Sequence, residues 1–311
     1  MVITVTPNTA IDKTYTVEGF GLDHVHRPSA SRTVAGGKGI NVVRVLKTLG
    51  IDGLATGFVG GAIGDAVLRL IYEEGLPHDF VRVRDESRLC IAVVDPQNGT
   101  QTEINENGPE ISPDELEMML GKAGSLMAGR EYMVLCGSCP PGVPTSFYGD
   151  IIRMAKCAGL KTVLDTSNDH LRESVKAAPY MVKPNVTELS QLVGRELLTL
   201  EEIVRAAKSL KGHYEVNITA VTMGRSGAIV TDGERVWKAV PPEIQFASAV
   251  GSGDAFLAMF IASMINGESI QDALVSGTAA GAANATTFGA GFCSKECIMD
   301  IRRAVTLTEI S

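Results

Sequence analysis

Short apolar runs alternate with longer stretches of helical periodicity from the first residues onward. Residues 2–6 (VITVT) and 54–60 (LATGFVG) are apolar, β-rich runs that predict strands. Residues 38–50 and 64–75 show helical periodicity and each ends on a glycine, which is a common helix stop. The first quarter of the chain therefore predicts a β-α-β-α succession.

The same rhythm continues to the end of the chain. A helix is expected at 112–127, where Ser112 and Glu115 have the spacing of a capping box. Strands that are apolar throughout and are separated by helices are typical of a parallel sheet covered on both faces. We therefore expect an α/β fold, with further strands at 132–137, 161–167, 180–185 and 218–223, and with closing helices at 252–266, 269–287 and 294–304.

Two segments interrupt this rhythm. Residues of about 11–35 alternate in polarity, and 87–109 predicts a hairpin that turns at Asn98-Gly99. Neither segment can build a core alone, so we expect them to form one small sheet that serves as a lid or a dimer contact. No interdomain linker is visible, and residues 1–311 are expected to form a single domain.

Composition narrows the classes of function. The 311 residues are 45% hydrophobic and 21% charged, with a net charge of −8, which argues against a general nucleic-acid or membrane-surface binder. No run approaches the roughly 20 apolar residues needed to cross a bilayer, and the N-terminus lacks the features of a signal peptide. A cytoplasmic location is expected.

The six cysteines do not suggest a disulfide framework. Cys136 and Cys139 form a CxxC pair, and Cys293 and Cys297 a CxxxC pair. A zinc site would need a second close pair or nearby histidines, and neither is present. Reduced thiols are the favoured interpretation.

The segment VGSGDAF opens a predicted helix with small residues and an acid. The first N–H groups of a helix are unpaired and lie at the positive end of its dipole, so they can bind a phosphate. Gly251, Ser252 and Gly253 would allow close approach of such an anion, and Asp254 would follow it. The simpler alternative is that Ser252 caps the helix and Asp254 interacts with its dipole.

The segment AGGKGIN (35–41) has the same form, with Lys38 and Asn41 one helical turn apart. It could bind a ligand or simply start a helix. It is not a Walker A loop, because GxxxxGK spacing is absent and no Ser or Thr follows the lysine. No GxGxxG follows the first strand, which argues against an NAD-dependent dehydrogenase.

Three further features allow both a functional and a structural interpretation. Asn185 and Glu188 of VKPNVTEL could hold a hydrated Mg²⁺ or form a capping box. The glycine turn in VTMGRSGAIV could line a nucleotide site or form a plain hairpin. Arg88, at the start of an apolar run, could bind a ligand or be solvated.

Taken together and in order, PNTAID, AGGKGINV, VKPNVTEL, TMGRSGA and VGSGDAF resemble the PfkB branch of the ribokinase-like carbohydrate kinases. Within that family, the chain is similar to the sugar-phosphate subgroup, which includes 1-phosphofructokinases and tagatose-6-phosphate kinases. The motifs extend from residue 7 to beyond 290. The resemblance implies a central, mostly parallel sheet flanked by helices, with a small β-sheet lid that often pairs between subunits.

On the donor side, the resemblance implies that Asp254 is the catalytic base and that Gly251, Ser252 and Gly253 form an anion hole. It implies ATP and Mg²⁺ as cofactors, with Asn185 and Glu188 near the hydrated ion. The residues it assigns to ATP are Lys183, Asn185, Thr222, Gly224, Ser226, Gly227, Gly253 and Asn284.

On the acceptor side, the resemblance implies that Asp12 binds sugar hydroxyls and that Arg27 and Arg88 reach the substrate's phosphate from the lid. The remaining residues assigned to the acceptor are Gly36, Gly37, Lys38, Asn41 and Ser138. The chain has SAVGSGD where many sugar kinases have D-T-x-G-x-G-D, as is typical of the sugar-phosphate subgroup.

The expected activity is transfer of a phosphoryl group from ATP to a ketohexose monophosphate, foremost fructose 1-phosphate. Tagatose-6-phosphate kinase and 6-phosphofructokinase activities of the same family remain alternatives. A nucleoside kinase is disfavoured by Arg27, Lys38 and Arg88, and a silent sugar-phosphate sensor by the intact base and metal-binding residues. The expected partners are small molecules and a second copy of the chain, bound through the lid.

Overall fold

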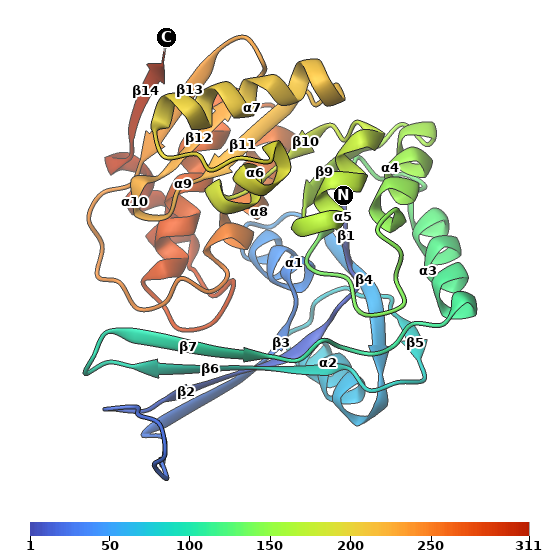
Figure 1. Cartoon of the computed structure of the whole chain (residues 1–311), viewed down its shortest axis with the longest axis vertical. Helices are drawn as coiled ribbons and strands as arrows, with labels where there is room; N and C mark the ends of the chain where they lie inside the picture. Colours follow the sequence, from blue (N-terminus) through green and yellow to red (C-terminus); the bar gives the residue numbers. More distant parts are fainter. Residues whose placement is uncertain (311) are drawn as a thin grey trace.

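The large sheet of the protein has ten strands, as seen in a computed structural model that describes residues 1–310 (Figure 1). The seven strands from β11 to β5 pair in parallel, whereas β11, β12, β13 and β14 pair antiparallel at one edge. The strand order is β14 (Thr306–Ile310), β13 (Val236–Val240), β12 (Ala228–Thr231), β11 (Ile218–Thr222), β10 (Met181–Val182), β9 (Lys161–Asp165), β8 (Tyr132–Cys136), β1 (Val2–Thr6), β4 (Gly53–Gly60) and β5 (Val81–Val83).

Helices cover both faces of this sheet, as the uninterrupted apolar strands predict. The helices are α1 (Lys38–Thr48), α2 (Gly61–Glu73), α3 (Pro113–Leu126), α4 (Phe147–Cys157), α5 (Asn168–Ser174), α6 (Val186–Val193), α7 (Leu200–Tyr214), α8 (Ser252–Ile265), α9 (Ile270–Ala285) and α10 (Lys295–Ala304), with 3₁₀ turns η1 (Val175–Ala177) and η2 (Gly224–Ser226). Helices α3 to α7 pack on one face, and α1, α8, α9 and α10 on the other. None of the helices within residues 1–310 has both the length and the apolar character to cross a membrane.

Alternation along β8 shows how the sheet divides the core. Met133 and Leu135 pack beneath α3 and α4, whereas Tyr132, Val134 and Cys136 face α1 and α8. Helix α8 is apolar on nearly all sides because it lies between the sheet, α1 and α9, so its apolar residues are not confined to one stripe.

A second, four-stranded sheet extends from the main body, at the bottom of Figure 1. Its order is β3 (Ala30–Gly36), β2 (Ala10–Thr16), β6 (Arg88–Asp95) and β7 (Thr100–Asn105). These strands come from the two segments that interrupt the β-α rhythm, and β6 and β7 form the expected hairpin around Asn98-Gly99. The fold expected from the sequence, a mostly parallel sheet with helices on both faces and a small second sheet, is confirmed.

Two local expectations differ from the structure. The strand expected at 180–185 is limited to Met181–Val182, because Lys183 turns into a buried ion pair and Pro184 has no N–H to donate to a neighbouring strand. The described chain does not end in a helix: β14 follows α10 and pairs with β13. Its residues are mostly exposed and do not form an apolar run, so the sequence pattern did not predict this edge strand.

Candidate functional site

The first turns of α1 and α8 line one side of a cavity of about 620 Å³. The two helices pack together, so their unpaired N–H groups and positive dipole ends lie around one space. Twelve of the residues proposed from the sequence line this cavity: Asp12, Gly37, Lys38, Asn41, Arg88, Lys183, Asn185, Glu188, Thr222, Gly251, Gly253 and Asp254.

Glycines at the two helix starts are required by their surroundings. Gly251 has φ of +78°, and a Cβ there would lie 2.4 Å from the Cβ of Ala290. A Cβ on Gly36 would lie 2.2 Å from the carboxyl carbon of Asp12. Both glycines therefore allow close packing, and Gly251 also exposes backbone to the cavity, whereas Gly36 lies outside its lining.

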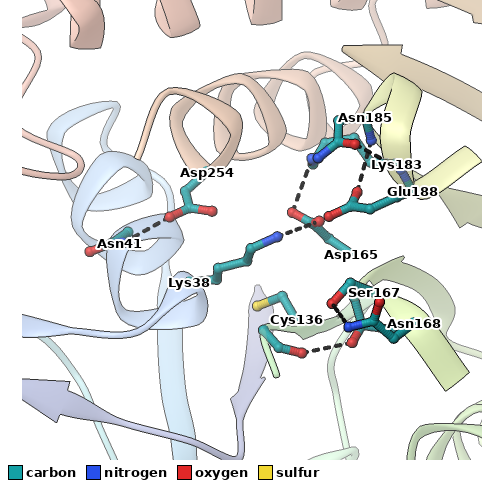
Figure 2. A network of polar contacts seen from close by, with 12 residues as sticks. Lys38, Asn41, Cys136, Asp165, Ser167, Asn168, Lys183, Asn185, Glu188 and Asp254 are labelled. Carbon is teal, nitrogen blue, oxygen red and sulfur yellow. Dashed lines mark hydrogen bonds and ion pairs between the residues drawn. The ribbon is translucent and has the colours of Figure 1, made fainter. Parts of the chain in front are cut away.

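Asp254 lies in the first turn of α8 and is 5% exposed. Its Oδ2 accepts a hydrogen bond of 2.8 Å from the side-chain amide of Asn41 on α1 (Figure 2). Burial raises the pKa of Asp254, and the nearby Lys38 ammonium offsets this only in part. A buried carboxylate with a raised pKa beside a cavity is suited to accept a proton.

Asp165 joins two lysines that come from different parts of the chain. It ends β9, with Lys38 Nζ 2.8 Å from one carboxylate oxygen and Lys183 Nζ 3.1 Å from the other. Figure 2 shows Lys38 extending between Asp254 and Asp165. Burial acts to raise the pKa of Asp165, but the two ammonium groups outweigh it and the pKa is lowered. The arrangement fixes two positive charges at the cavity wall.

Asp12 and Arg88 approach the cavity from the small sheet. They lie on the neighbouring strands β2 and β6, and Arg88 donates to the carbonyl oxygens of Asn8 and Glu106. Burial raises the pKa of Asp12 to about 6, against the opposing charges of Arg88 and Arg44. The small sheet thus presents both acidic and cationic side chains to the same space, since Lys13 and Glu103 line the cavity as well.

Asn185 and Glu188 form the capping box of α6. Asn185 Oδ1 accepts from the Glu188 N–H, and Glu188 Oε2 accepts from the Asn185 N–H, both at 2.8 Å. Both residues also line the cavity, so the structural and ligand-binding interpretations are compatible. No group of three or more His, Cys, Asp or Glu residues within 1–310 could hold a metal ion. A hydrated Mg²⁺ fits here through Glu188 Oε1, which is free of hydrogen bonds within that range, provided that water and phosphate supply its other ligands.

A second cavity of about 870 Å³ adjoins the first. Both are lined by Asn185, Thr222, Ala249 and Gly253. The second is further lined by Gly224 and Gly227 of the glycine turn and by Ser252. The turn is the predicted strand-turn-strand of β11, η2 and β12. The two cavities therefore meet at the first turn of α8.

Some proposed residues lie outside the cavity walls. Arg27 is exposed in the connection between β2 and β3, and Ser226 is exposed in η2. Ser138 lies 3.4 Å from Asn8, whose carbonyl oxygen accepts from Arg88. Asn284 is fully buried: it donates to the Val250 carbonyl oxygen and accepts from the Gly291 N–H. It therefore supports the loop before α8 from behind.

Sequence reasoning missed several residues of the site. Asp165 follows the apolar part of a buried parallel strand, and an acid at that end of a strand was a usable signal. Two segments without a motif also line the cavities. From β7, the first cavity is lined by Gln101, Glu103 and Asn105. From the loop before α8, the second cavity is lined by Pro241, Pro242, Glu243, Ile244 and Phe246.

Comparison with known proteins identifies the family. Residues 3–297 match the pfkB family of carbohydrate kinases. The chain is 33% identical to a tagatose-6-phosphate kinase of Staphylococcus epidermidis over the whole of both chains, and 34% identical to a 1-phosphofructokinase of Borreliella burgdorferi over 92% of each.

A solved structure shows the same fold. The crystal structure of phosphofructokinase-2 from Escherichia coli in complex with substrates and products matches with a TM-score of 0.92 at 27% identity, covering 97% of this chain and 98% of that one. The resemblance drawn from the motifs is thereby confirmed. The chain belongs to the pfkB family of carbohydrate kinases and is a phosphotransferase.

Proposed function

We propose that the protein transfers the γ-phosphoryl group of ATP to a ketohexose monophosphate, foremost fructose 1-phosphate, giving fructose 1,6-bisphosphate and ADP. One observation carries the proposal: two cavities meet at the start of α8, beside the buried carboxylate of Asp254. A kinase needs adjoining donor and acceptor sites, with a base where they meet.

The larger cavity is assigned to ATP. The glycine turn of η2 lets a nucleotide approach the backbone closely, and the α8 N-terminus provides N–H groups for phosphate oxygens. The smaller cavity is assigned to the sugar phosphate, with Asp12 accepting from its hydroxyls and Arg88 facing its phosphate. The small sheet then acts as a lid that excludes water during transfer.

The reaction uses the chain's own groups as follows. The acceptor hydroxyl oxygen attacks the γ-phosphorus, its proton passes to Asp254, and the bond to the bridging oxygen breaks so that its electron pair leaves with ADP. The N–H groups of Gly251 and Gly253 stabilise the transferring group, and Lys38 neutralises its charge from the acceptor side. The Ser252 N–H donates to the Ala249 carbonyl oxygen at 3.2 Å and would have to leave it to join them. Mg²⁺, held near Glu188 through water, would neutralise charge on the ATP phosphates.

The names of two relatives provide two alternative substrates. The Staphylococcus epidermidis protein is named a tagatose-6-phosphate kinase and the Escherichia coli structure a phosphofructokinase-2, so tagatose 6-phosphate and fructose 6-phosphate are the second candidates. Fructose 6-phosphate differs from fructose 1-phosphate in the position of the phosphate, and tagatose 6-phosphate differs in that position and in one stereocentre.

Coupled measurement of ADP release tests the proposal. We expect kcat/KM to be highest for fructose 1-phosphate when it is compared with fructose 6-phosphate and tagatose 6-phosphate. A higher value for either of the others would replace the assigned substrate but keep the kinase. Calorimetric binding of a sugar phosphate without ADP release above the ATPase background would instead indicate a sensor.

A further inference from the structure

Arg44 lies on α1, 5% exposed, outside both cavity walls. A guanidinium has five N–H donors, and here every one is paired. Two go to the Glu74 carboxylate at 2.6 and 3.0 Å. The other three go to Asn41 Oδ1 at 2.7 Å, the Ala290 carbonyl oxygen at 2.9 Å and the Ala35 carbonyl oxygen at 2.8 Å.

This pairing determines which way the Asn41 amide faces. Arginine has donors only, so it must face the amide oxygen of Asn41. The amide NH₂ is thereby directed to Asp254 Oδ2, 2.8 Å from Nδ2. Within residues 1–310, Oδ1 of Asp254 has no hydrogen-bond partner, and Asp254 lines the acceptor cavity. One carboxylate oxygen is therefore held and the other is left for the acceptor hydroxyl.

We propose that Arg44 is a positioning residue for phosphoryl transfer: anchored by Glu74, it orients the Asn41 amide, which holds Asp254 for proton acceptance. This proposal builds on the proposed function, since it assumes that Asp254 is the base. Arg44 also ties α1 to strand β3 of the small sheet and to the loop after α9, so the base, the small sheet and that loop share one anchor.

The effect on Asp254 has a defined sign. The hydrogen bond from Asn41 lowers the pKa of Asp254 and partly offsets the effect of burial. A misoriented Asn41 amide would turn its oxygen toward the carboxylate, so the pKa would rise further. The other charged groups that face Asp254 are Lys38 on α1, Asp165 on β9, Lys183 after β10 and Asp12 on β2.

The first test replaces Arg44 by lysine, which keeps the charge but has three donors instead of five. We expect Arg44→Lys to lower kcat about 10- to 100-fold, to change KM for ATP less than about twofold, and to move the acid limb of the kcat profile up by about half a pH unit or more. Arg302→Lys is the matched control. Arg302 donates to Ser276 Oγ at 2.8 Å on α9, and its replacement should alter Tm but not the acid limb.

A double-mutant cycle separates positioning from packing. If Arg44 acts through Asn41, Arg44→Lys in an Asn41→Ala background should change kcat by less than about twofold. An equal loss of kcat in both backgrounds, or an unchanged acid limb in Arg44→Lys, would overturn the proposal. If Arg44→Lys does not fold, Glu74→Gln takes its place in the same cycle. Glu74 is the partner of Arg44 in the ion pair and is more exposed than Arg44, so its replacement disturbs the core less.

A readout without turnover distinguishes failure of this proposal from failure of the proposed function. Titration of the Asp254 carboxyl carbon by NMR, in the protein without ligands, should show a higher pKa in Arg44→Lys than in the wild type. An unchanged pKa overturns the positioning role even if the protein proves inactive on every ketohexose phosphate.

Discussion

Asp254 is the residue on which the proposed chemistry depends most directly. Asp254→Asn keeps the side-chain shape but removes the proton acceptor, so we expect kcat to fall about 10²- to 10⁴-fold. Binding of ATP, measured by calorimetry, should stay within about threefold of the wild type. Near-normal turnover in this variant would rule out Asp254 as the base.

Asp12 should give the acceptor site its own pH dependence. Its pKa of about 6 means that the carboxylate loses its charge as the pH falls through that value. We therefore expect kcat/KM for the sugar phosphate to decrease as the pH is lowered past about 6. In Asp12→Asn, kcat/KM should be lower at every pH and should no longer show this acid limb. A limb retained in Asp12→Asn would assign it to another group.

The same shift in Asp12 has a consequence for stability. Because the pKa of Asp12 in the folded protein lies above its ordinary value of 3.8, the folded protein holds the proton more tightly than the unfolded chain. Its contribution to the free energy of unfolding is therefore greatest below pH 3.8 and is lost as the pH rises to about 6. Chemical denaturation of wild type and Asp12→Asn across this range measures the difference.

At the scale of elements, the start of α8 can be tested with a pair of glycines. Gly251 and Gly267 stand at the two ends of the helix with φ of +78° and +77°, but a Cβ at Gly267 would meet nothing within 4 Å. Gly251→Ala and Gly267→Ala should both lower the free energy of unfolding by about 1 kcal/mol through left-handed strain, and both should therefore lower Tm. Only Gly251→Ala should also lower kcat, because its Cβ would displace the loop at Ala290. Equal kcat values would contradict a phosphate-binding role for this helix start.

The capping box of α6 is expected to serve both the helix and the metal. Glu188→Gln retains an oxygen for the cap but lowers the negative charge, so Tm should change little. The Mg²⁺ concentration giving half-maximal kcat should rise about tenfold or more. Glu202→Gln, in the equivalent box of α7 with Thr199, is the matched control and should leave Mg²⁺ dependence unchanged. If the Mg²⁺ dependence changed equally in both variants, Glu188 would serve only as a helix cap.

At the scale of the whole molecule, we propose that two copies pair through the small sheet. Side chains alternate along β7, so Glu103 and Asn105 line the cavity while Ile104, 61% exposed, faces the other way. Leu22 and Val25, in the connection between β2 and β3, are exposed as well, and exposed apolar side chains that lie together are typical of a contact surface. Ile104→Glu should convert a dimer to a monomer in sedimentation velocity, whereas Leu198→Glu, at a still more exposed leucine before α7, should not. A wild-type monomer would contradict the proposal.

Much of the architecture follows from local sequence patterns. The strands β1, β8 and β9 are buried at all or nearly all of their positions, and glycines or capping residues mark several of the helix ends, so local propensity and pattern agree with the fold. The edge strand β14 could not be predicted, because its stability comes from pairing with β13 rather than from its own residues. The motif around Asp254 was recognisable because its glycines and acid are contiguous.

The remaining features of the site depend on tertiary contacts. The sequence determined that Asp254 opens a helix, but only the fold placed it against Asn41, which is 213 positions away along the chain. Only the fold joined Lys38 and Lys183 at Asp165, and only the fold gave Arg44 its five acceptors. The physical reason is that hydrogen bonds and ion pairs act over a few ångströms in space, whereas sequence patterns report neighbours along the chain. Local order therefore specified the elements, and packing decided which side chains would act together.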